Sequence, residues 1–116
     1  SLTKLVLPST IKVISQFAFS ECTSLKNILI PPSVTTVNQN AFRNCKSLQK
    51  IVIPESVTAI SEGLFCGCSY LSDVTLPLSI NEIRKFAFYE CFSLRQIQLP
   101  QSLAVLGDIS SIVAQN

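Results

Sequence analysis

Cysteine offers this chain the most chemistry, because it has five cysteines and no histidine. Cys66 and Cys68 flank one glycine, and this C-x-C pair is the nearest approach to a redox or metal motif. Structural zinc sites use a second cysteine pair or histidines, and the chain supplies neither beside Cys66 and Cys68. We expect Cys66 to point outward and to be reactive at most, and we expect no metal and no cofactor.

Hydrolytic and phosphate chemistry also lacks the residues that it needs. A serine or cysteine nucleophile would have no histidine base, and three glycines do not form a glycine-rich phosphate loop. Glu21 and Glu90 share a position in the repeat described below, but they lie several units apart and indicate a solvated face. We predict that the chain is not an enzyme, with no catalytic residues.

The other chemistry-bearing residues belong to an ungapped internal repeat with a period of 23 residues. Leucines open the units, a proline follows each short apolar segment, and phenylalanine and cysteine recur in the second half. These positions are Leu2, Leu25, Leu48, Leu71 and Leu94; Pro8, Pro31, Pro54, Pro77 and Pro100; Phe19, Phe42, Phe65 and Phe88; and Cys22, Cys45, Cys68 and Cys91. Cysteine in one inward column beside phenylalanine is expected to be a small buried hydrophobe.

Each unit divides into three local elements. The alternation Ile28, Leu29, Ile30 predicts a short strand that ends at the proline, since proline lacks an amide donor. β-branched residues over 33–37 predict a second extended segment. Phe42 and Cys45, three positions apart in the Ala-Phe-x-x-Cys pattern, indicate a helical turn with both side chains on one face.

A single unit cannot bury its own apolar residues, so neighbouring units must stack. We therefore predict one leucine-rich repeat domain over 1–116: a β-rich, α/β-type solenoid wound as a right-handed superhelix. It comprises repeats 2–24, 25–47, 48–70 and 71–93 and an atypical terminal repeat, 94–116, in which Ser111 and Ala114 replace the phenylalanine and cysteine.

Charge and hydropathy restrict the partners. A net charge of +2 and lysines without interleaved aromatic residues disfavour nucleic acid. The apolar runs are too short for a membrane span. Because Ser1 is followed directly by repeat sequence, we expect no targeting segment in this chain. We expect that the array was cut within a longer series and that its uncapped first unit favours a homo-oligomer.

A candidate binding surface lies on the outward positions of the first strand. Three neighbouring units place Val6, Leu29 and Val52 at the same outward position, and Asp73 opposes the basic residues that flank them. Those basic residues are Lys4, Lys26, Lys50 and Arg95. A semi-apolar stripe with a basic border predicts a protein-binding surface, although outward β-branched residues also simply suit strands.

The combination L-x-x-I-x-I-P, S-V-x-x-I and A-F-x-x-C within one unit resembles the BspA-like, or treponemal-type, leucine-rich repeat family. The second unit carries it best, in Leu25, Ile28, Ile30, Pro31, Ser33, Val34, Val37, Ala41, Phe42 and Cys45. The resemblance covers Leu2 to about Leu106. It implies a curved solenoid, an extracellular or cell-surface location and a role in adhesion to host matrix proteins. It assigns no binding residues.

We therefore expect a non-enzymatic protein-interaction or adhesion module that binds a host or partner protein through the repeat sheet face. The alternative is a structural spacer or self-assembling oligomerisation segment of a longer repeat protein. Leu29→Glu or Val52→Glu would weaken partner capture and leave the fold intact in the first case. In the second, only changes at the ends of the array would matter.

Overall fold

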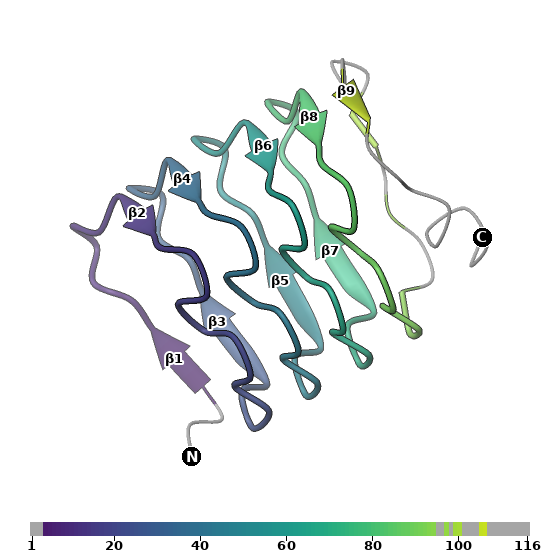
Figure 1. The fold of residues 1–116 in the computed structure, drawn as a ribbon. Coiled ribbons are helices and arrows are strands. Elements are labelled where there is room, and N and C mark those ends of the chain that lie inside the picture. The colour runs from purple at the N-terminus through teal and green to yellow at the C-terminus, as the bar shows by residue number, and fades with distance from the viewer. Residues whose placement is uncertain (1–3, 95–96, 98, 101–104, 107–116) are drawn as a thin grey trace.

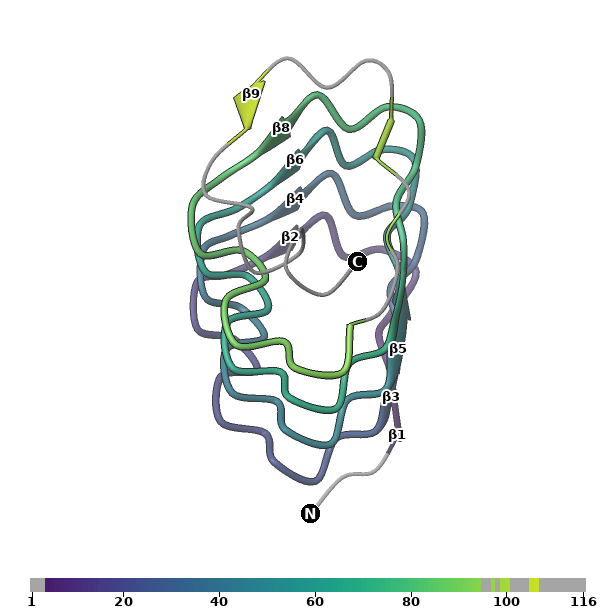
Figure 2. The same cartoon turned by 90° about the vertical axis from the view of Figure 1, so that its right-hand side faces the viewer.

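The computed structural model describes residues 4–94, 97, 99–100 and 105–106. Nine short strands lie in this part of the chain, and they alternate between two sides of successive coils (Figure 1). The strands are β1 (Lys4–Val6), β2 (Val13–Ile14), β3 (Asn27–Leu29), β4 (Thr36–Val37), β5 (Lys50–Val52), β6 (Ala59–Ile60), β7 (Asp73–Thr75), β8 (Glu82–Ile83) and β9 (Val105–Leu106). Seen from the end of the stack, the coils have similar outlines and lie one behind another, each displaced from the next (Figure 2).

Pairing between coils is parallel and confirms the period. β1 pairs with β3 and β5 with β7, while β2 pairs with β4, and β6 with β8 and then β9. Leu5 lies opposite Ile28, and Ile83 lies opposite Leu106, so each residue pairs with its equivalent in the next unit. The repeat pattern therefore reaches Leu106, whereas the atypical tail predicted after it lies outside the described residues.

In the four units whose first strand is described, the column proline follows the end of that strand, as predicted. The carbonyl of Pro31 accepts a hydrogen bond from the amide of Val34 at 3.1 Å, and that of Pro54 accepts one from Val57 at 3.1 Å. Each proline thus closes a turn that leads from the first strand to the second. Of the extended segment predicted over 33–37, only Thr36–Val37 forms a strand, β4, and Ser33 lies in the preceding turn.

The core is a set of columns that run along the stack. One column holds the bulkiest side chains of the core, those of phenylalanine. Its ring centroids are 5.5 Å apart between Phe19 and Phe42, 5.7 Å between Phe42 and Phe65, and 5.6 Å between Phe65 and Phe88. The rings are nearly parallel, and Phe42, Phe65 and Phe88 are buried. The predicted alignment of this column is confirmed, and burying each such ring contributes about 1.5–3 kcal/mol.

The helical turn predicted for the Ala-Phe-x-x-Cys segment is wrong, although Phe42 and Cys45 do share the buried side. Successive amides alternate in direction. Arg43 and Cys45 donate to carbonyls three residues back, at 3.2 Å, whereas Phe42 and Asn44 donate to carbonyls of the next coil, at 3.1 and 2.8 Å. The segment is a run of tight turns that joins the hydrogen-bonded ladder between coils, a pattern that a helix cannot make.

Candidate binding surface

The first strands carry three exposed apolar side chains side by side. Val6, Leu29 and Val52 are 61%, 63% and 61% exposed, while Ile28 and Ile51 beside them are buried. Val6 lies opposite Leu29 in the parallel register of β1 and β3. This alternation follows from strand geometry, in which successive side chains point to opposite faces. The stack therefore converts one outward position of the repeat into a continuous stripe.

These side chains border a groove of about 830 Å³, which we call the apolar groove. Its lining comes from the first strands and the proline turns that follow: Val6, Asn27, Ile28, Leu29, Ile30, Pro32, Lys50, Ile51, Val52, Pro54 and Glu55. Lys50 and Glu55 are its charged members, and both are exposed. The surface is thus an apolar channel with one basic and one acidic group at its border.

The structure brings together four of the seven predicted binding residues, namely Val6, Leu29, Val52 and Lys50. Lys26 is exposed but does not line the apolar groove. Lys4 lies in β1 opposite Asn27, and Arg95 lies outside the described residues. Asp73, expected to oppose the basic border, lies opposite Lys50 in the register of β5 and β7.

Sequence reasoning missed the contribution of Pro32, Pro54, Asn27 and Glu55 to this groove. Pro32 carried a usable signal, because it is the one proline outside the proline column. Glu55 follows the column proline of its unit, in the turn between the two strands. The turns therefore form one wall of the groove.

A sequence model of the BspA type leucine rich repeat region matches residues 1–110, in six copies. The chain belongs to this family. Its members are generally protein-interaction modules rather than enzymes. Residues that pair between neighbouring strands are 23 positions apart, which is the period of the sequence repeat. A search of curated proteins gave no match.

Solved structures of bacterial leucine-rich repeat proteins are similar to this chain in fold and in sequence. A leucine rich cell surface protein from Faecalibacterium prausnitzii is similar at 35% identity with a TM-score of 0.85, covering 94% of this chain and 30% of that one. A leucine-rich repeat protein from T. pallidum is 36% identical, with a TM-score of 0.66 and coverage of 91% and 41%. One from Eubacterium ventriosum is 26% identical, with a TM-score of 0.58 and coverage of 93% and 42%. The chain thus spans less than half of each relative.

The cysteine column of the BspA-type repeat is structural where it is fully buried. The thiols of Cys45, Cys68 and Cys91 donate to main-chain carbonyls of the preceding coil, those of Phe19, Phe42 and Phe65, at 3.1, 3.0 and 3.1 Å. Burial raises the pKa of the Cys91 thiol to about 12, so this thiol stays protonated at neutral pH. The predicted inward column of small buried residues is confirmed for these three cysteines.

Cys66 lies apart from this column and is half-buried, and burial raises the pKa of its thiol. A raised pKa lowers the thiolate fraction and with it the reactivity of the sulfur. Within the described residues, no group of three or more His, Cys, Asp or Glu side chains is placed to hold a metal ion. In the same part of the chain, no helix is long and apolar enough to span a membrane.

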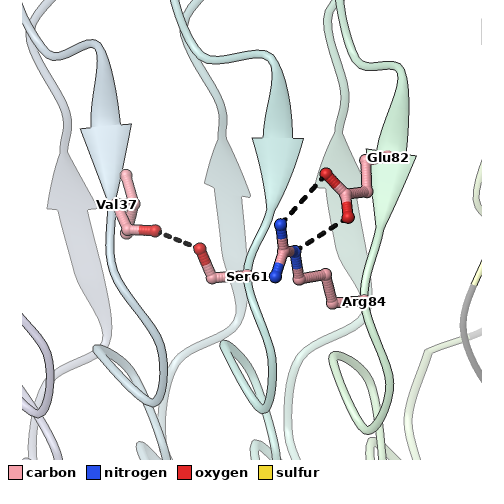
Figure 3. Close-up of polar contacts among 4 residues, drawn as sticks. All are labelled: Val37, Ser61, Glu82 and Arg84. Carbon is pink, nitrogen blue, oxygen red and sulfur yellow. Dashed lines mark hydrogen bonds and ion pairs between the residues drawn. The ribbon is translucent and has the colours of Figure 1, made fainter. Parts of the chain in front are cut away.

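A second groove, of about 760 Å³, runs beside the ends of the second strands, and we call it the polar groove. Its lining is Ser15, Gln16, Asn38, Gln39, Ala59, Ser61, Glu62 and Arg84. Arg84 forms an ion pair with Glu82 in β8, with Nε 2.9 Å from the carboxylate, and Ser61 donates to the carbonyl of Val37 at 2.6 Å (Figure 3). Sequence analysis did not single out this surface.

Proposed function

We propose that this BspA-type repeat binds a partner protein through the apolar groove, as an adhesion module at the cell surface with a host matrix protein as its partner. The observation that carries the proposal is the continuous exposure of Val6, Leu29 and Val52 on three adjacent coils. A contiguous apolar patch with a polar border is typical of protein interfaces. The surface location is supported by the F. prausnitzii relative, whose description names a cell surface protein.

Rigidity favours binding at this surface. The exposed residues stand on short strands whose neighbours Ile28 and Ile51 are buried in the core, so the backbone beneath the groove is held in place. A preformed surface loses little conformational entropy when a partner docks. Lys50 and Glu55 at the border would orient the partner rather than supply most of the affinity.

The introduction of a charge in the apolar groove tests the proposal. Leu29→Glu and Val52→Glu should each weaken binding to purified host matrix proteins about ten-fold or more, because each places a carboxylate in the apolar contact. Binding is measured on immobilised chain by surface plasmon resonance. Val13→Glu is the matched control, since Val13 is also an exposed valine in a strand but lies outside the apolar groove. Equal binding by all three variants and the parent would contradict the proposal.

The alternative function is a spacer or self-assembling segment. Repeat arrays can associate end to end through the strand edges of their terminal coils. Light scattering decides this point: a mass of one chain at high concentration would refute self-association.

A further inference from the structure

The polar groove carries hydrogen-bonding groups that the protein itself leaves unused. The Asn38 carboxamide and the Glu62 carboxylate are both half-buried. Neither side chain makes a hydrogen bond or ion pair with any other described residue. Polar groups in this situation keep their water until a ligand offers equivalent hydrogen bonds. The groove is therefore ready to exchange water for a polar ligand.

The polar side chains of the groove come from two adjacent columns of the repeat, with Asn38, Ser61 and Arg84 in the first and Gln39 and Glu62 in the second. Asn38 follows β4 and Arg84 follows β8, and their amides donate to the carbonyls of Ile14 and Ile60, each at 2.9 Å. Within the second column, the Gln39 side chain donates a hydrogen bond from Nε2 to Oε1 of Gln16 at 3.1 Å. Fixed positions reduce the entropy lost when a ligand binds.

Charge and polarity narrow the class of ligand. The guanidinium of Arg84 is paired with Glu82, which leaves the Glu62 carboxylate as the unpaired charge of the lining and disfavours polyanions. Ala59 is the one apolar lining residue, so the groove has no pocket for the apolar side chains of a peptide. A hydroxyl-rich chain without negative charge matches this mixture of donors and acceptors and meets no repulsion from the Glu62 carboxylate.

We propose that the polar groove binds a neutral oligosaccharide. Each sugar hydroxyl both donates and accepts hydrogen bonds, and the groove offers partners for both. The side-chain NH₂ of Asn38 and the guanidinium of Arg84 donate, and the Glu62 carboxylate accepts. Because both columns are polar in successive coils, successive sugar units would meet successive polar positions. This site is separate from the apolar groove, with which it shares no lining residue.

Nuclear magnetic resonance titration tests the proposal on the ¹⁵N-labelled chain with three neutral probes: maltohexaose, cellohexaose and chitohexaose. At least one should give saturable shifts at residues 15–16, 38–39, 59–62 and 84. Asn38→Ala and Glu62→Ala should each raise its dissociation constant about five- to ten-fold, as expected for one lost hydrogen bond to a ligand. Leu29→Glu, in the apolar groove, should leave binding unchanged.

Three results would overturn this inference. The first is the absence of saturable shifts with all three probes. The second is a set of shifts centred on the apolar groove, with sensitivity to Leu29→Glu in place of Asn38→Ala. The third is tighter binding of a sulfated hexasaccharide or of an uncharged Gly-Ser hexapeptide than of any neutral sugar. Because Leu29→Glu separates the two grooves, the outcome here is independent of the outcome for protein binding.

Discussion

Two backbone positions in each of the four described turn segments lie in the left-handed region, where side chains other than glycine and asparagine are disfavoured. The first position holds Phe17, Asn40, Gly63 and Phe86, and the second holds Glu21, Asn44, Gly67 and Glu90. Glycine and asparagine in the inner coils suit this geometry, whereas phenylalanine and glutamate cost about 1–2 kcal/mol each. The turn could not be predicted from the phenylalanines and glutamates, because neither residue type indicates a positive φ.

Gly67 is the position where this constraint is sharpest. Its φ is 79°, and a β-carbon added there would lie 2.0 Å from Oδ1 of Asn44. We predict that Gly67→Ala lowers the free energy of unfolding by about 1–2 kcal/mol, through backbone strain and through displacement of the Asn44 side chain. Urea denaturation followed by circular dichroism measures the change.

A double variant separates the two causes. In an Asn44→Gly background the steric part disappears, so Gly67→Ala should cost less there than in the parent chain. Asn44→Gly by itself removes the hydrogen bond from Asn44 Nδ2 to Glu21 Oε2, at 2.7 Å, and serves as the reference. Equal costs in both backgrounds would show that the clash contributes nothing.

At the scale of the element, periodicity predicted the two strands of each unit and their register. Outward and inward positions alternate in β3 and β5 as expected, and equivalent residues pair between coils. The turn segment was predicted incorrectly because positions three apart share a face in a helical turn and in a run of tight turns alike. Hydrogen bonds to the next coil decide between them, and a single unit contains no information about bonds to its neighbour.

In the phenylalanine stack, the contribution of each ring to the free energy of unfolding depends on its place in the array. Phe65 is fully buried between Phe42 and Phe88, whereas Phe19 has one ring neighbour and is half-buried. We predict that Phe65→Ala costs about 3–5 kcal/mol in the free energy of unfolding and that Phe19→Ala costs distinctly less. Urea denaturation of the two variants gives the comparison, and equal losses would mean that the rings do not stabilise one another through the column.

At the scale of the molecule, stacking explains which parts of the candidate site were predictable. Any outward position of the repeat becomes a stripe, so Val6, Leu29 and Val52 were placed correctly from their spacing alone. The walls depend instead on residues that break the repeat, as Pro32 does, and on the place of each residue in its unit: Lys50 lies in β5 and lines the groove, whereas Lys26 precedes β3 and does not. The polar groove was missed because its residues differ in type from coil to coil while sharing polarity.

A solenoid of this kind should tolerate the loss of a whole unit but not of half of one. Deleting residues 48–70 joins Ser47 to Leu71 and keeps every column in register, since Leu48 and Leu71 are equivalent positions. We predict that this chain folds and unfolds cooperatively, with a urea m-value lower by about a fifth, because unfolding exposes the surface of one coil fewer.

Deleting residues 48–58 removes a first strand but leaves the turn segment of the same unit, so strands and phenylalanines would face the wrong partners. Circular dichroism and urea denaturation should then show no cooperative transition. If both deletions unfolded alike, nearest-neighbour stacking of equivalent positions would not be what holds the molecule together.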